Sequence, residues 1–264
     1  SAVVLKNGWS SDSSTVPSLR KLFQFGVEEP GAGHHLVALA RAAGYSVWWI
    51  SNQDDVSIDQ EHAQLADHVH MFNRMPGRNS ATLDEVVLPQ VEAALLARQE
   101  RKFIVVHLMG AHPHYTKRFP AGANPFDDTH DSVDKQLSEL GRSPWTAYFR
   151  EEYDAAILYH DDVVARILEM TSQQADTGYT AALYLSDHGQ EVGHELDRAG
   201  HSSTTAAGYR IPAIVWERQA RTAAVAGLHE RGFRSDWAAW TIVHLLGIDW
   251  TGRDESRDVL DPGY

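Results

Sequence analysis

The chain has 264 residues, no cysteine, and a formal net charge of −13 that results from 23 Lys and Arg against 36 Asp and Glu. Without a dense run of basic residues, this acidic balance argues against nucleic-acid binding, which depends on clustered positive charge. The absence of cysteine excludes thiolate nucleophiles, disulfides and cysteine-bound zinc.

The order of apolar and polar residues predicts strands and helices that alternate along the chain. A first strand starts within residues 2–5, so we expect a soluble piece of a longer protein that is N-terminally incomplete. No run of about 18 apolar residues is present, and no membrane span is expected. Further strands are expected at residues 45–50, 102–109, 179–185 and 211–216, and helices at residues 33–43, 83–98, 151–173 and 235–246.

Two details complete this pattern. Ser235 is expected to be the N-cap of the last helix. Residues 113–144 contain Pro, Gly and Asp with little periodicity, and we expect a long loop there. The alternation as a whole predicts an α/β fold, with a mainly parallel central sheet and helices on both faces. We expect a single domain that spans residues 1–264.

Polar side chains follow three of the predicted strands. Asn52 and Gln53 follow the second strand, His112 follows the third, and Asp187-His188 follow the fourth. Because the carboxyl ends of parallel strands share one edge, these side chains are expected to converge there. Asp oxygens and His nitrogens are both zinc ligands. For Asp187-His188 the alternative is an ordinary Asp-His-Gly turn. For His112 it is a loop histidine that makes one hydrogen bond.

A hydroxyl-rich turn lies between the first strand and a helix-like segment. It runs from Ser10 to Thr15 and is followed by Val16-Pro17. Such a turn can present a hydroxyl at a helix N-terminus, where free N–H groups and the helix dipole favour an anionic phosphate. The alternative is a plain Ser/Thr cap of the helix.

Several longer motifs, in the same order, resemble the periplasmic catalytic domain of phosphoethanolamine transferases, within the alkaline phosphatase and sulfatase superfamily. The resemblance covers most of the chain. It rests on Trp49-Ile50-Ser51-Asn52-Gln53, on His107-Leu108-Met109-Gly110-Ala111-His112, on Tyr115-Thr116-Lys117-Arg118-Phe119, on Tyr153-Asp154-Ala155-Ala156-Ile157-Leu158-Tyr159, and on Ser186-Asp187-His188-Gly189 with His201.

The resemblance implies a hydroxyl nucleophile, activated by zinc, that forms a covalent phosphoethanolamine intermediate. It implies one or two Zn²⁺ ions, with Asp187 and His188 as ligands and with His112 and His201 holding a second metal or the transferred phosphate. The family nucleophile stands seven residues before the proline of the hydroxyl turn, which is Ser10 when counted from Pro17. Other hydroxyls between Ser10 and Thr15 remain candidates. The substrate-binding residues that it implies are Asn52, Gln53 and Gln190.

The chain departs from the family at two places that bear on the metal site. The family carries a zinc-ligating Glu at the end of a preceding strand, and nothing before Ser1 supplies it here. The family's Asp-His-Gly-Glu appears as Asp187-His188-Gly189-Gln190, which removes an acidic group near the phosphate. Both departures suggest weak metal binding or an inactive fragment.

The expected function is zinc-dependent transfer of phosphoethanolamine from phosphatidylethanolamine to lipid A, core oligosaccharide or a periplasmic glucan. The expected location is the periplasmic face of the bacterial inner membrane, with membrane contact through the missing N-terminal region. The alternatives are a phosphodiester or sulfate-ester hydrolase of the same superfamily and a non-catalytic domain with an incomplete metal site. Thr15-Val16-Pro17-Ser18-Leu19 lacks the Arg of the sulfatase nucleophile motif, which argues against sulfate-ester hydrolysis.

Overall fold

The fold is known from a computed structural model that describes residues 2–27, 29, 34–53, 61–73, 80–126, 131–174, 178–218 and 227–264. Its strands form a four-stranded sheet, a three-stranded sheet and a small two-stranded hairpin. The helices are α1 (Thr15–Phe23), α2 (Leu36–Ala42), α3 (Leu88–Leu96), α4 (Ser132–Glu139), α5 (Pro144–Gln173) and α6 (Ala238–Leu246). Short 3₁₀ turns lie at Ala63–Leu65, Asp84–Val87, Tyr115–Lys117, Ala206–Gly208, Leu228–Glu230, Ser235–Trp237 and Glu255–Arg257.

The four-stranded sheet has the order β5-β8-β1-β9, with β5 at Ala181–Leu185, β8 at Arg210–Glu217, β1 at Ala2–Trp9 and β9 at Gly232–Arg234. Strand β8 is antiparallel to both β5 and β1, whereas β1 and β9 are parallel. Because β8 lies antiparallel between them, β5 and β1 run in the same direction. Both therefore end at the same edge of the sheet.

The three-stranded sheet is parallel throughout and has the order β3-β2-β4, with β3 at His68–Met71, β2 at Ser46–Ser51 and β4 at Lys102–His107. The apolar run of β2 is buried from Val47 to Ile50. This burial is expected of a central parallel strand that is covered on both faces. The hairpin pairs β6 (Glu191–Val192) with β7 (Ala199–Gly200).

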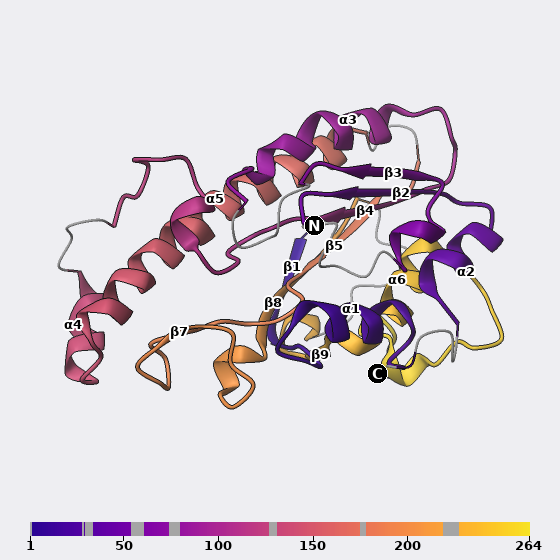
Figure 1. The fold of residues 1–264 in the computed structure, drawn as a ribbon. Helices are drawn as coiled ribbons and strands as arrows, with labels where there is room; N and C mark the ends of the chain where they lie inside the picture. Colours follow the sequence, from indigo (N-terminus) through magenta and orange to yellow (C-terminus); the bar gives the residue numbers. More distant parts are fainter. Residues whose placement is uncertain are drawn as a thin grey trace.

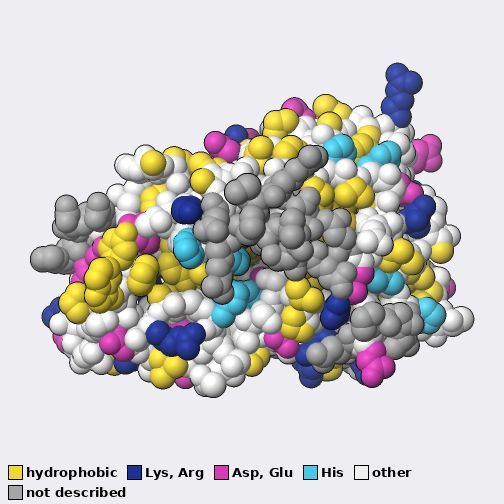
Figure 2. Space-filling view, viewed as in Figure 1, with side chains coloured by type: hydrophobic (Ala, Val, Ile, Leu, Met, Phe, Trp, Pro, Cys, Tyr) yellow, Lys and Arg dark blue, Asp and Glu magenta, His cyan; other side chains and the backbone are white. Residues whose placement is uncertain are grey.

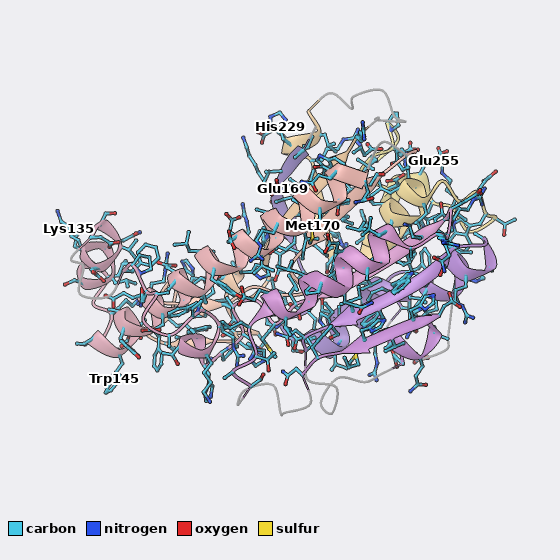
Figure 3. The ribbon with its side chains drawn as sticks, turned by 90° about the horizontal axis from the view of Figure 1, so that it is seen from above. Lys135, Trp145, Glu169, Met170, His229 and Glu255 are labelled. Atoms are coloured by element: carbon cyan, nitrogen blue, oxygen red, sulfur yellow. The ribbon has the colours of Figure 1, made fainter. Side chains whose placement is uncertain are left out.

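Helices cover both faces of the sheets. One core packs α1, α2 and α6 against β1, β8 and β2, through residues such as Leu22, Val37 and Val243. A second core packs α3 and α5 against the opposite face of β2 and β4. Figure 1 shows these two layers, and Figure 3 shows α3 and α5 running together over the strands. The sequence-based prediction of an α/β fold with helices on both faces is confirmed.

Two helices in the middle of the chain differ from the prediction. Helix α5 begins at Pro144, where Ser143 caps it by accepting from the Thr146 amide, so it starts seven residues before residue 151. The region expected to be a long loop contains α4, which begins with a capping box made by Asp131 and Asp134. Its apolar positions Val133, Leu137 and Leu140 do have helical spacing, but the helix has only eight residues and Leu137 alone of them is buried.

The start of α6 also differs from the prediction. The helix follows a 3₁₀ turn and its N-cap is Trp237. Ser235, the predicted cap, is buried and its hydroxyl instead accepts from the Ser11 amide. This bond ties the hydroxyl-rich turn to the C-terminal part of the domain. No helix among the described residues has the length and apolar character needed to cross a membrane.

Candidate active site

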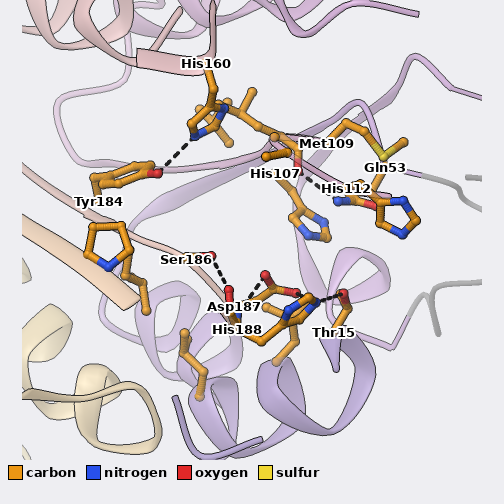
Figure 4. Close-up of a pocket in the computed structure, with 18 of the residues that line it drawn as sticks. Thr15, Gln53, His107, Met109, His112, His160, Tyr184, Ser186, Asp187 and His188 are labelled. Atoms are coloured by element: carbon orange, nitrogen blue, oxygen red, sulfur yellow. Dashed lines mark hydrogen bonds and ion pairs between the residues drawn. The ribbon is translucent and has the colours of Figure 1, made fainter. Parts of the chain in front are cut away.

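The carboxyl ends of β4 and β5 and the start of α1 meet at one cavity of about 300 Å³. Figure 4 shows His107 and His112 facing Asp187 and His188 across it, with Thr15 beside His188. Histidine side chains reach the surface near the middle of the face in Figure 2, between the parts that carry α5 and α1. The predicted convergence at a strand edge is therefore seen in the structure.

The turn that carries Asp187 and His188 is held from several sides. The Ser186 hydroxyl donates to the His188 carbonyl (2.7 Å), and the Asp187 carboxylate accepts from the His188 amide (3.0 Å). The Gly189 amide donates to the Gly208 carbonyl (2.9 Å). A Cβ at Gly189 would lie 2.0 Å from the Ala207 carbonyl oxygen, so only glycine fits here.

His188 is oriented so that one ring nitrogen faces the cavity. Its Nδ1 lies 2.9 Å from the Gly189 carbonyl oxygen and donates to it, which leaves the lone pair on Nε2. That Nε2 lies 3.5 Å from the Asp187 carboxylate and 3.5 Å from the Thr15 hydroxyl. Two oxygen atoms with lone pairs thus lie near the same ring nitrogen, and such an arrangement is favourable when a cation or a proton lies between them.

The hydroxyls of the Ser10–Thr15 turn have different surroundings. Ser10 is buried, its hydroxyl donates to the main-chain carbonyl of Asp187, and it lies 3.1 Å from the Ser18 hydroxyl. It also accepts from the Asp12 amide (3.2 Å). Thr15 is the first residue of α1 and lines the cavity beside His188. The Ser10 hydroxyl therefore supports the turn, while the Thr15 hydroxyl faces the cavity.

His112 and His201 lie next to His188. The ring centroids are 4.4 Å apart for His188 and His201, and 5.8 Å apart for His112 and His201. Burial lowers the pKa of His112, and its Nδ1 lies 3.2 Å from the Pro113 carbonyl oxygen. All four predicted metal and phosphate residues are thus brought together, with Asp187 completing the set.

His107 was not predicted as a site residue, although it belongs to a quoted motif. It is the last residue of β4 and lines the cavity. Burial lowers its pKa, against the opposing charges of Asp187 and Asp84. Its Nδ1 is buried and has no hydrogen-bond partner among the described residues. The rule that strand ends carry site residues selects His112 and could also select His107. Because His107 directly follows an apolar run, however, the sequence makes it look like part of the strand.

The three residues predicted to bind substrate have different positions. Gln53 and Gln190 line the cavity, where Gln53 donates to the Leu108 carbonyl (2.9 Å) and Gln190 accepts from the Tyr115 hydroxyl (3.3 Å). Asn52 is fully buried and donates to the Asp84 carboxylate (2.9 Å) and to the Thr82 carbonyl (3.0 Å). Its Nδ2 therefore bonds to the protein and not to the cavity, and its Oδ1 is buried without a hydrogen-bond partner among the described residues.

Asp84 organises the loop after β4 and was not predicted from the sequence. It accepts from the amides of Met109 and Gly110, both at 2.8 Å. Burial alone would raise the pKa of Asp84, but the His160 ring 3.8 Å away and hydrogen bonds from Asn52 and these two amides outweigh it and lower that pKa. The Nε2 of His160 in turn lies 3.0 Å from the Tyr184 hydroxyl.

The distances between the possible ligand atoms show whether these residues fit a zinc ion. Among the described residues, no group of three or more His, Asp or Glu side chains could hold a metal ion. The Asp187 carboxylate and the Thr15 hydroxyl nevertheless each lie 3.5 Å from His188 Nε2. Tetrahedral zinc with bonds of about 2.0 Å sets its ligand atoms roughly 3.3 Å apart. The three donors therefore fit part of a catalytic zinc site.

Comparison with known proteins gives consistent results. The family model described as Sulfatase matches residues 1–248. Phosphoethanolamine transferase EptC of Escherichia coli K12 is 26% identical over 245 residues, which are 87% of this chain and 41% of that protein. Phosphoethanolamine transferase CptA of Salmonella typhimurium LT2 is 28% identical over the same share of both chains. The resemblance inferred from the motifs is confirmed.

A solved structure has the same fold. The C-terminal periplasmic domain of EptC from Escherichia coli, in complex with Zn, matches with a TM-score of 0.88 at 24% identity. The match covers 100% of this chain and 76% of that domain. The chain thus spans about two fifths of the length of the curated relatives and about three quarters of this solved domain.

Proposed function

The chain belongs to the sulfatase family, and from this we propose that it transfers phosphoethanolamine through a covalent intermediate on Thr15. The observation that supports this most directly is the convergence of the Thr15 hydroxyl, the Asp187 carboxylate and His188 Nε2. Transfer in place of hydrolysis is proposed because the relatives that match 87% of the chain are named phosphoethanolamine transferases. We propose that the complete protein acts at the periplasmic face of the bacterial inner membrane.

Thr15 is proposed as the nucleophile in preference to Ser10. The Ser10 hydroxyl donates to the Asp187 carbonyl and is buried, so attack on a substrate would require that bond to break. The Thr15 hydroxyl lines the cavity at the N-terminus of α1. The free amides and dipole of that helix end favour the negative charge of a phosphate.

Each step assigns a role to residues of this chain. The Thr15 oxygen forms a bond to phosphorus as the bond to the diacylglycerol oxygen breaks, and the hydroxyl proton leaves with diacylglycerol. An acceptor hydroxyl then attacks phosphorus, and its proton restores the Thr15 hydroxyl. His112 and His201, whose rings lie next to His188, are proposed to contact the phosphate oxygens. Zinc held by Asp187 and His188 would lower the pKa of the hydroxyl and offset the phosphate charge.

Phosphatidylethanolamine is the proposed donor, and a hydroxyl or phosphate of lipid A, core oligosaccharide or a glucan is the proposed acceptor. Gln53 and Gln190 line the cavity and are proposed to contact the donor headgroup. The Nδ2 of Asn52 donates to Asp84 and to Thr82, so we propose that Asn52 supports the fold around the site and does not contact substrate. One or two Zn²⁺ ions are proposed, with His112 and His201 near a second position.

Intact-mass measurement after incubation with phosphatidylethanolamine tests the nucleophile. We expect a phosphoethanolamine adduct that maps to Thr15, is lost in Thr15→Ala and is retained in Thr15→Ser. Ser10→Ala is the matched control and should keep the adduct, with its melting temperature measured alongside. An adduct that maps to Ser10 would overturn the assignment. No adduct in the complete protein with zinc present would favour a non-catalytic domain, and steady release of free phosphoethanolamine without an acceptor would favour a hydrolase.

A further inference from the structure

A chain of buried polar side chains joins the segments that carry the candidate active site. Its centre is Asp84, the first residue of the 3₁₀ turn Asp84–Val87, whose side chain is buried. The carboxylate accepts from the amides of Met109 and Gly110 at 2.8 Å each, and from the Nδ2 of Asn52 at 2.9 Å. Three segments therefore meet at one carboxylate: the turn itself, the loop after β4 and the residue after β2.

The positions that Asp84 holds lie next to residues of the candidate active site. Gly110 stands two residues before His112, and Asn52 directly precedes Gln53, which lines the cavity. A buried amide that loses its acceptor is costly, so the loop keeps this conformation only while the carboxylate accepts from it. The direction in which His112 leaves the loop thus depends on Asp84.

The same loop is held at its other end by a buried arginine. Arg118 is only 4% exposed, its Nε donates to the His112 carbonyl at 3.2 Å, and its Nη1 donates to the Ser80 carbonyl at 2.9 Å. The Asp84 carboxylate thus accepts from amides of the loop, while the Arg118 guanidinium donates to a carbonyl of it. Hydrogen bonds that include a charged group are stronger than neutral ones, so the loop backbone is fixed at both ends.

His160 of α5 extends this network to β5. Its Nδ1 lies 3.8 Å from the Asp84 carboxylate, and its Nε2 lies 3.0 Å from the Tyr184 hydroxyl. The His160 ring also packs on the loop after β4, since a Cβ at Gly110 would lie 3.5 Å from its Cε1. Tyr184 stands three residues before Asp187. The network therefore reaches from the loop after β4 to the strand that leads into Asp187.

The charges around His160 determine where its proton lies. The pKa of Asp84 is lowered despite its burial, so this carboxylate is ionised at neutral pH and favours a proton on the Nδ1 that faces it. Burial raises the pKa of Tyr184, so its hydroxyl keeps its proton and donates to the lone pair on Nε2. Figure 4 shows His160 and Tyr184 together on the side of the cavity away from Thr15.

We propose that Asp84, His160 and Tyr184 form a positioning network that fixes the loop after β4 relative to the turn after β5. This inference rests on the proposed transfer reaction, in which the loop supplies His112 and the turn supplies the zinc ligands. The three side chains act through the backbone of these segments and not by contact with the reacting atoms. Such positioning affects the rate strongly, because a displacement of about 1 Å can slow a reaction about 100-fold.

Removal of the Tyr184 hydroxyl tests the network in the complete protein with zinc present. We expect Tyr184→Phe to lower kcat about tenfold while KM changes less than about twofold, because the groups that contact substrate remain. Tyr179→Phe is the matched control, since the Tyr179 hydroxyl donates to the Glu217 carboxylate at 2.6 Å and Tyr179 does not line the cavity. Both variants should lose about 2–4 °C of melting temperature, but the control should keep its kcat. Equal kcat in the two variants, or a change in KM alone, would overturn the proposal.

A second substitution shows whether the side chains act together. His160→Phe keeps a ring that packs on Gly110 and removes both nitrogens, so it should lower kcat by itself. In the His160→Phe protein, Tyr184→Phe should then change kcat by less than about twofold, because the contact that it removes is already lost. A full tenfold effect of Tyr184→Phe in both backgrounds would show that the two residues act separately and would contradict the network.

Nitrogen NMR of the histidine rings gives a test that does not require transfer activity. We expect His160 to carry its proton on Nδ1, and we expect Tyr184→Phe to shift the ring signals of both His160 and His112, whereas Tyr179→Phe leaves them unchanged. A His160 proton on Nε2, or unchanged His112 signals in Tyr184→Phe, would overturn the network. A native protein that shows these shifts but forms no phosphoethanolamine adduct would refute the proposed function and still support the network.

Discussion

Asn52 allows a sharp test, because two roles for it predict different results. The sequence suggests that it binds substrate, whereas the structure shows its amide donating to the Asp84 carboxylate and the Thr82 carbonyl. In Asn52→Ala both bonds are lost at a fully buried position. A bond to a charged group contributes about 1.5–3 kcal/mol and a neutral one about 1 kcal/mol. Since both come from one amide, we expect a loss of about 3 kcal/mol of unfolding free energy.

Urea denaturation and thermal melting measure this loss, and steady-state kinetics separates it from substrate binding. A change of about 3 kcal/mol corresponds to roughly 6–12 °C in melting temperature for a chain of this size. Gln53→Ala is the matched comparison, because Gln53 lines the cavity and its loss should change KM more than stability. An Asn52→Ala protein within about 0.5 kcal/mol of the native stability, but with a raised KM, would refute the supporting role.

Two further predictions concern the metal and the acid stability. Asp187→Ala and His188→Ala should each abolish zinc binding, measured as metal content per chain. Substitution of the exposed Asp197 by Ala is the control and should leave the metal content unchanged. Unchanged metal content in both site variants would exclude Asp187 and His188 as ligands. Burial lowers the pKa of His35 from 6.5 to about 4, so the unfolded chain binds more protons between these values. Stability present above pH 6.5 should therefore fall toward pH 4, by about 1–2 kcal/mol after allowance for partial exposure. His35→Gln should flatten this dependence in urea titrations at pH 7 and pH 5, and an unchanged slope would contradict the assignment.

The location of the site could be predicted from the sequence because it depends on one general rule. Strand ends in a parallel arrangement share an edge, and this rule predicts from the sequence that Asp187, His188 and His112 lie together. Strand patterns such as those of β2 and β4 were predicted within one or two residues, since long apolar runs leave little ambiguity.

The proposed choice of Thr15 over Ser10 rests on geometry that sequence spacing does not determine. Counting from Pro17 selects Ser10, but the turn folds so that the Ser10 and Ser18 hydroxyls both donate to the Asp187 carbonyl. Which hydroxyl of a turn faces a cavity depends on its tertiary partners, and these lie about 170 residues away in the sequence. The direction of the Asn52 side chain was equally unpredictable, because its partner Asp84 belongs to a 3₁₀ turn without a motif of its own.

The candidate active site is assembled from two separate sheets, and this connects packing with chemistry. His107 and His112 lie at and after the end of β4, whereas Asp187 and His188 follow the end of β5, and these strands belong to different sheets. The distance between the two groups is thus set by the helices packed on both faces and by the Thr15 turn. Catalytic groups must be held to within about 0.5 Å. Substitutions that loosen these helix cores are therefore expected to reduce how precisely the site is assembled as well as the stability of the fold.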